Sequence, residues 1–77
     1  MKIEEFKKKD VNWVICTDGK VYIYWEISDD KLLLKTRAQD NIYVKISEIQ
    51  DTCNVRDLKN HETPEEYFKI KCPEFDI

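Results

Sequence analysis

Residues 21–27, V-Y-I-Y-W-E-I, decide the fold of this chain. Six of these seven residues are β-branched or aromatic, and the stretch contains neither glycine nor proline. Such side chains fit a pleated strand better than a helix, and in a strand they alternate between two faces. We predict a strand with one side in the core and the other side outward. The inward set is Val21, Ile23, Trp25 and Ile27, and the outward set is Tyr22, Tyr24 and Glu26.

Three further stretches show the same alternation, and we predict that the four strands pair in chain order as a meander. They are residues 11–17 (V-N-W-V-I-C-T), 31–37 (K-L-L-L-K-T-R) and 42–46 (I-Y-V-K-I). The first is apolar on both sides, which predicts burial on both faces. In the other two, Leu32, Leu34, Ile42, Val44 and Ile46 face inward and Leu33, Lys35, Tyr43 and Lys45 face outward.

The connections between these strands are short. Asp18-Gly19 predicts a hairpin with a type I′ turn, in which both central residues have positive φ. For S-D-D-K at 28–31 we expect a type I turn or a longer loop, and A-Q-D-N at 38–41 makes the third connection.

The two ends of the chain are less regular. Ile3 and Phe6 lie three residues apart, which predicts one or two helical turns. For residues 47–60 we predict a short helix or turn, because their apolar residues are spaced at helix-like intervals. From Thr63, the sequence T-P-E-E is a helix capping box, whereas Phe68, Ile70 and Cys72 alternate as in a strand. We predict a single helical turn at 64 that leads into a fifth strand.

Size and composition limit the class of protein. We take residues 1–77 as one small globular domain, since the chain is too short for two cores. No apolar run reaches the ~20 residues that span a bilayer, and the first ten residues lack the apolar core of a secretory signal. Three cysteines, an odd number, favour buried reduced thiols. We therefore expect a cytoplasmic protein that does not contact membranes.

The predicted outward side of the sheet is basic, although the chain carries a net charge of −3. Six cations and one acid give this side a formal charge of +5. Its members are Tyr22, Tyr24, Glu26, Lys31, Leu33, Lys35, Arg37, Tyr43, Lys45, Lys69 and Lys71. The residues that we predict to contact a partner are Tyr22, Tyr24, Leu33, Lys35, Arg37, Tyr43 and Lys45.

Three interpretations of this side compete. Tyrosine and arginine are favoured anchors of protein interfaces, so the first interpretation is a site for a larger protein partner. The chain would then be a subunit, an adaptor or a stoichiometric inhibitor. Phages and mobile elements make small proteins of the last kind to block host factors. Tyrosines among cations are also typical of single-stranded nucleic-acid binders. An ordinary solvent face is the plainest alternative. A homodimer that buries Trp25 or Leu33 is a further one.

No pattern in the sequence indicates catalysis, so we expect no enzyme and no catalytic residue. Cys16, Cys53, His61 and Cys72 supply metal-binding atoms but contain no Cys-x-x-Cys pair, so we expect no metal or other cofactor. His61 has no nucleophile beside it, and a chain with one glycine has no glycine-rich phosphate loop.

The expected fold is mainly β with a minor α component. It is a single antiparallel sheet of four or five strands with a short N-terminal helix, bent or closed into a small barrel of SH3, Sm or OB type.

Overall fold

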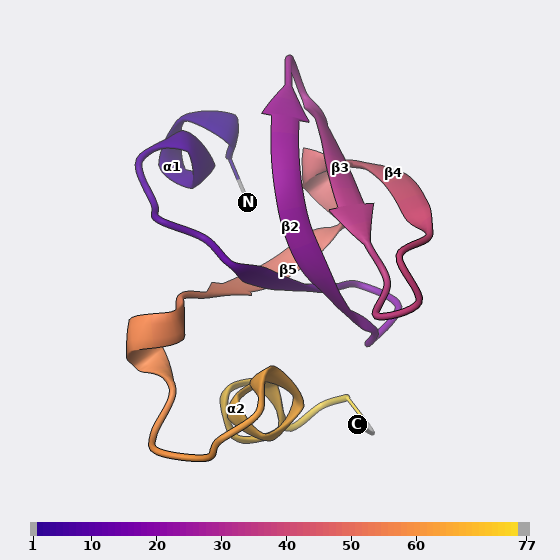
Figure 1. The fold of residues 1–77 in the computed structure, drawn as a ribbon. Helices are drawn as coiled ribbons and strands as arrows, with labels where there is room; N and C mark the ends of the chain where they lie inside the picture. The colour runs from indigo at the N-terminus through magenta and orange to yellow at the C-terminus, as the bar shows by residue number, and fades with distance from the viewer. Residues whose placement is uncertain (1, 76–77) are drawn as a thin grey trace.

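The computed structural model describes residues 2–75, in which five strands form one antiparallel sheet (Figure 1). The strands are β1 (Trp13–Cys16), β2 (Val21–Ser28), β3 (Lys31–Lys35), β4 (Asn41–Lys45) and β5 (Ile49–Cys53). The helices are α1 (Ile3–Lys7) and α2 (Pro64–Lys71), with short 3₁₀ helices η1 (Ile46–Glu48) and η2 (Val55–Asp57). No helix in residues 2–75 is long and apolar enough to cross a membrane.

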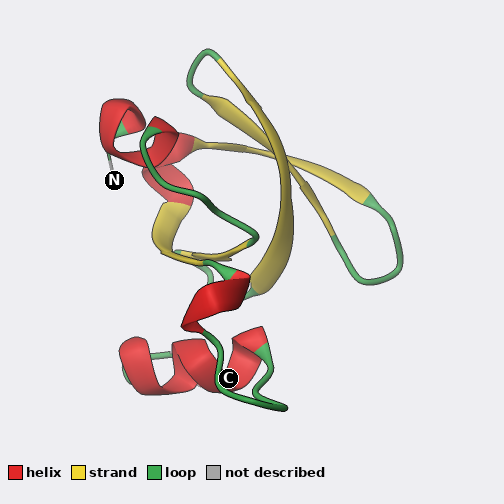
Figure 2. Ribbon diagram, turned by 60° about the vertical axis from the view of Figure 1, so that its left-hand side comes forward, coloured by secondary structure: helices red, strands yellow, loops and turns green. Residues whose placement is uncertain are grey.

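The strand order in the sheet is β4-β3-β2-β1-β5, which confirms the predicted antiparallel sheet and its four-strand meander. The sheet is strongly twisted but not closed, because β4 and β5 form its two edges (Figure 2). The closed form of the expected small barrel is therefore absent.

Apolar clusters lie on both faces of the sheet. The first cluster joins α1 to the strands through Phe6, Val11, Val14, Cys16, Leu32, Leu34 and Ile49. The second joins α2 to the strands through Ile15, Cys53, Phe68 and Cys72. Strand β1 contributes to both, because Val14 and Ile15 point to opposite faces and are each 0% exposed. The predicted burial of this strand on both faces is confirmed.

The predicted orientation of β2 is wrong for most of the strand. Tyr22 and Tyr24 pack against the first apolar cluster, and the Tyr24 ring makes an edge contact with the Phe6 ring at 5.2 Å between centroids. The error lies in the choice of inward face, because both alternating sets of this stretch are apolar or aromatic. A β-bulge follows at Trp25, since Tyr24 pairs with Leu34 and the next paired residue is Glu26. The extra residue shifts the alternation by one position, so that Ile27 also reaches the first cluster, as predicted.

The first hairpin forms as predicted but through a different turn. The Gly19 N–H donates to the Cys16 carbonyl at 2.9 Å, and the Cys16 N–H donates to the Lys20 carbonyl at 3.0 Å. Gly19 has a φ of 81° and Asp18 has no positive φ, so the loop has three residues and is not a type I′ turn. The turn between β2 and β3 consists of two residues, Asp29 and Asp30. Asp29 has a φ of 56°, whereas a type I turn needs a negative φ at this position, so the predicted type I geometry is excluded.

The last part of the chain is helical, and the predicted strand after the capping box is wrong. The Thr63 hydroxyl accepts a hydrogen bond from the Glu66 N–H at 3.2 Å, and Pro64 begins α2. Phe68 and Cys72 lie one helical turn apart and are both buried against the sheet. Phe68 and Cys72 therefore reach the core from a helix, and the fifth strand is β5, where the sequence had predicted a short helix or turn.

A buried asparagine ties η2 to the segment before β1. Asn54 is 8% exposed, and its side-chain amide donates to the Asp10 carbonyl at 2.7 Å. Its Oδ1 accepts from the Arg56 N–H at 2.8 Å, and the neighbouring Val55 N–H donates to Asn12 Oδ1 at 2.8 Å. The bonds from Asn54 to Asp10 and from Val55 to Asn12 join parts of the chain that lie more than 40 residues apart in sequence.

We predict that Asn54→Ala lowers the free energy of unfolding by about 2 kcal/mol, because the cap is lost and buried backbone groups lose their partners. Urea denaturation measures this loss. Arg56→Ala is the matched control. It removes an exposed ion pair with Asp10 and the Nε–H bond to Asn54 Oδ1 at 3.0 Å, but Oδ1 keeps its bond from the Arg56 backbone N–H, so the cost is at most about 1 kcal/mol. An equal loss in both variants would contradict the special role of Asn54.

Candidate functional site

One side of the sheet is only half covered. Helix α2 packs over β1, β5 and the start of β2, while the rest of β2 and the outer sides of β3 and β4 remain uncovered. We call this uncovered region the open face. Its residues are Trp25, Glu26, Lys31, Leu33, Lys35, Tyr43 and Lys45.

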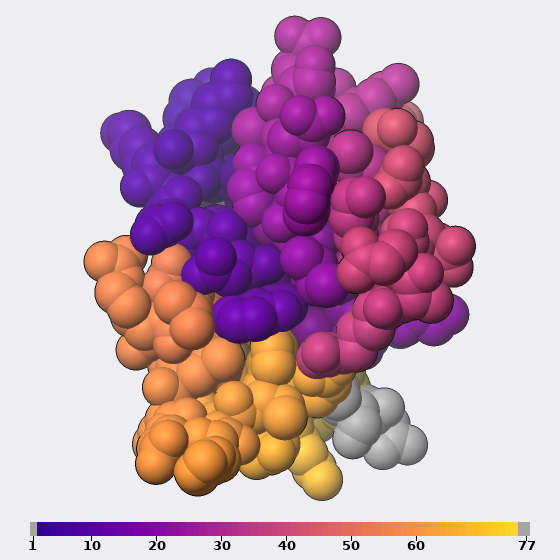
Figure 3. Space-filling model, viewed as in Figure 1, coloured from indigo at the N-terminus to yellow at the C-terminus, as the bar shows by residue number. Residues whose placement is uncertain are grey.

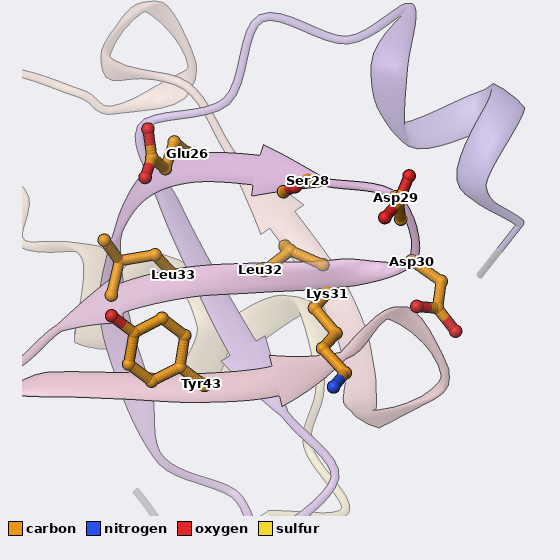
Figure 4. A pocket seen from close by; sticks show the side chains of 8 residues that line it. All are labelled: Glu26, Ser28, Asp29, Asp30, Lys31, Leu32, Leu33 and Tyr43. Carbon is orange, nitrogen blue, oxygen red and sulfur yellow. The ribbon is translucent and has the colours of Figure 1, made fainter.

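Three residues form a row across the centre of the open face. The strand register places Glu26 opposite Leu33 and Leu33 opposite Tyr43, and Figure 4 shows the Leu33 and Tyr43 side chains next to each other. The Tyr43 side chain is 71% exposed although it lies in the middle of a strand. With the tip of the β2–β3 hairpin, this row lines a shallow hollow of about 450 Å³.

Trp25 lies on the same side, because its neighbour Tyr24 faces the first cluster. The Lys35 ammonium lies 4.7 Å from the centroid of the indole ring, within the range of a cation–π contact. The indole is nevertheless 59% exposed. The open face thus carries two large exposed aromatic side chains, one on the central strand β2 and one on the edge strand β4.

Two lysines lie directly opposite each other at the end of the open face. Lys31 pairs with Lys45 across β3 and β4, and like charges in such a position are unfavourable. Neither lysine forms an ion pair within residues 2–75. Both line a second hollow together with Tyr43 and Glu48, whose carboxylate accepts the Lys45 backbone N–H at 2.7 Å.

Arg37 is engaged elsewhere. Its guanidinium binds the Glu65 carboxylate of α2 through two nitrogens, with Nη2–Oε1 at 2.6 Å and Nε–Oε2 at 3.1 Å. This ion pair holds the β3–β4 turn against the start of α2. In the free protein Arg37 thus contacts α2 and does not lie among the residues of the open face.

The open face is less basic than predicted. Lys69 and Lys71 belong to α2, and Arg37 is neutralised by Glu65. Three lysines and Glu26 remain, which gives the face a formal charge of +2 in place of the expected +5.

Four of the seven predicted contact residues lie together on the open face: Leu33, Lys35, Tyr43 and Lys45. Tyr22 and Tyr24 lie on the opposite side, against the first cluster. Trp25 was not predicted to be exposed, because the alternation was assigned to the wrong face of the sheet. Nearly every residue of this stretch is apolar or aromatic, so the pattern does not show which set is inward.

The thiols show no features of a reactive or metal-binding site. Burial, with smaller contributions from Asp18 and Glu48, raises the pKa of Cys16 to about 12, and burial with Asp57 first among the acids raises that of Cys53 to about 11. A thiol that stays protonated is a poor nucleophile and metal ligand. Cys16 lies in the first cluster and Cys53 and Cys72 lie in the second. No group of three or more His, Cys, Asp or Glu side chains in residues 2–75 is placed to hold a metal ion.

The open face combines aromatic and aliphatic contact area with three ammonium groups. Such a surface binds other molecules through burial and charge and needs no chemical step. Comparison of the chain with protein-family models, curated proteins and solved structures finds no match.

We predict that the two tyrosines on opposite sides differ in their effect on stability. Tyr24→Ala removes a ring packed on Phe6 and lowers the free energy of unfolding by about 2 kcal/mol, whereas Tyr43→Ala changes it by at most about 0.5 kcal/mol. Thermal and urea denaturation of both variants measure the difference. A large loss for Tyr43→Ala would show that Tyr43 is part of the core.

We also predict that the fold weakens at alkaline pH. Since the pKa of Cys16 is about 12 in the folded chain and 9.0 when unperturbed, the unfolded chain releases this proton first. The free energy of unfolding is then unaffected by this thiol below pH 9 and falls above it, by about 1 kcal/mol per pH unit. Urea denaturation at pH 8 to 10.5 measures the decline. Cys16→Ala must decline less steeply, and an unchanged slope would refute the assignment.

Proposed function

We propose that the protein is a non-catalytic binding module that acts through protein–protein contact, as a subunit, adaptor or stoichiometric inhibitor. The observation that carries this proposal is the exposure of Trp25 and Tyr43 on one face, with Leu33 beside Tyr43. Tryptophan and tyrosine dominate the binding energy of many protein interfaces because they bury a large area with few rotatable bonds. A strand-mounted pair on a rigid sheet is also held in place before binding, which lowers the entropy cost.

The distribution of charge favours a protein over a nucleic acid as partner. Of the six cations expected on this side, three remain on the open face, and Lys35 is occupied by the Trp25 ring. Binding to a phosphate backbone depends on several cations that act together. Two free lysines on a chain with a net charge of −3 provide little of that attraction.

We propose the cytoplasm as the place of action. The three described thiols are free and buried, which suits a reducing compartment, where such thiols stay reduced.

The test is capture of partners from the source cell by the tagged protein, followed by identification of the bound material. We expect wild type to retain a protein partner and Trp25→Ala and Tyr43→Ala each to lose it by about tenfold or more, since hot-spot aromatics typically contribute at least ~2 kcal/mol. Nuclease treatment must leave the captured protein unchanged.

Two matched controls remove exposed apolar side chains from other surfaces. The controls are Val55→Ala and Ile70→Ala. Val55 lies on η2 and is 57% exposed, and Ile70 lies on α2 and is 69% exposed. Both should capture the partner as wild type does. Equal losses in all four variants, or capture that disappears with nuclease, would refute a protein contact through the open face.

A further inference from the structure

The edge strand β4 has free backbone groups along its outer side. Thr36 N–H donates to the Asp40 carbonyl at 3.0 Å and Ile46 N–H donates to the Asp30 carbonyl at 2.9 Å, one at each end of the β3–β4 ladder. Antiparallel pairs alternate between hydrogen-bonded and non-hydrogen-bonded, so Ile42 and Val44 direct their backbone groups to β3. The odd-numbered residues of β4 direct theirs away from the sheet.

Two of these residues have outward backbone groups that are available for a new strand. The Lys45 N–H is already taken by the Glu48 carboxylate at 2.7 Å. The N–H and C=O groups of Asn41 and Tyr43 have no described partner on that side, since β4 is the last strand of the sheet. An edge of this kind is a template for an added strand.

The side chains along this edge differ between the two faces. On the face of the first cluster, Ile42 and Val44 are only partly buried and end the apolar surface. On the open face, Tyr43 lies between two hollows, and Lys31 and Lys45 line the second of them. A strand added next to β4 would therefore meet aliphatic side chains on one face and ammonium groups on the other.

We propose that β4 binds an extended segment of the partner protein as a sixth strand, and that this segment alternates apolar and acidic residues. This inference rests on the proposed function and specifies the partner at the same site. Its apolar residues cover Ile42 and Val44, and its acidic residues lie over Lys31 and Lys45, where a carboxylate relieves the repulsion between two opposed lysines.

The same charges favour an acidic segment over a second copy of this chain at the edge. Antiparallel pairing of β4 with β4 of another copy, centred on Tyr43, would place Lys45 opposite Asn41 of the second copy, so that the opposed Lys31 and Lys45 of each copy would still lack a carboxylate. An acidic segment has the complementary charge.

The first experiment uses a blocked peptide, acetyl-Thr-Val-Glu-Val-Glu-Val-Thr-amide, and the full-length protein labelled with ¹⁵N. We expect the peptide to slow amide hydrogen exchange at Asn41 and Tyr43, whose N–H groups are open in the free protein. The same peptide with lysine in place of glutamate should have no effect. If exchange at Asn41 and Tyr43 is already slow in the free protein and becomes slower as the protein concentration rises, the chain forms β4–β4 dimers. That result would overturn the proposal.

N-methylated peptides test the backbone contact itself. In the proposed register the peptide runs antiparallel to β4, with its glutamates opposite Tyr43 and Lys45. The glutamate N–H groups then point to β4, while the valine N–H groups point to solvent. N-methylation of the glutamates should abolish binding, and N-methylation of the valines should leave it. Equal effects of the two modifications would overturn strand addition.

A charge exchange tests the partner chemistry. The variant Lys31→Glu/Lys45→Glu should bind the glutamate peptide about tenfold more weakly at ~50 mM salt and should gain binding to the lysine peptide. Lys59→Glu, on the loop before α2, is the control and should bind as wild type does. No change in the double variant would overturn the role of these lysines.

The outcomes separate the two proposals. If Trp25→Ala loses the cellular partner and Lys31→Glu/Lys45→Glu keeps it, the open face is a protein-binding site but β4 does not select an acidic strand. If neither loses it, the proposed function itself fails.

Discussion

The structure depends on the burial of β1 on both of its faces. Val14 packs toward α1 and Ile15 toward α2, and neither is exposed to solvent. A chain of 77 residues has little apolar area to bury, and this arrangement divides that area between two small clusters that share one strand. Phe6 of α1 belongs to the first cluster, whereas Phe68 of α2 belongs to the second, and Figure 3 shows the indigo N-terminal residues and the yellow C-terminal residues on different parts of the surface. Loss of β1 would therefore open both clusters together.

The bulge at Trp25 follows from the same packing. Tyr22 and Tyr24 must face the first cluster because they pair with Val14 and Leu34, both of which are buried there. Ile27 also packs on the first cluster, but it follows Tyr24 by three residues, and an odd interval in a regular strand would place it on the opposite face. One additional residue resolves the conflict, and that residue is a tryptophan that points outward.

The sequence predicts the strands where apolar and polar residues alternate clearly. Ile42 and Val44 contrast with Tyr43 and Lys45, and their faces are correctly predicted. In β2 both alternating sets are apolar or aromatic, and tyrosine suits a core as well as a surface, so the pattern does not identify the inward face.

The same limit applies where one spacing fits two elements. Ile49 and Cys53 lie four residues apart, as do Phe68 and Cys72, and an interval of four places two side chains on one side of either a helix or a strand. Helix α2 is identified by its cap, in which Thr63 accepts a bond from Glu66, a local signal that outweighs the apparent alternation of the residues after it. For β5 no comparable signal exists, and its pairing with β1 depends on contacts distant in sequence. The candidate site was accordingly predictable on β3 and β4, and not on β2.

The lysines of the open face have two compatible roles. An edge strand with exposed aromatic and aliphatic side chains is prone to pair with other copies, and lysines at its end oppose such pairing. Lys31 and Lys45 are placed at the same end of β3 and β4, where a carboxylate of an added strand would reduce the repulsion between them. Protection against aggregation alone would need one charge on the edge strand, which Lys45 supplies. It would not need a second cation, Lys31, opposite Lys45. The opposed pair costs stability in the free protein, and a bound acidic strand is the condition under which that cost is recovered.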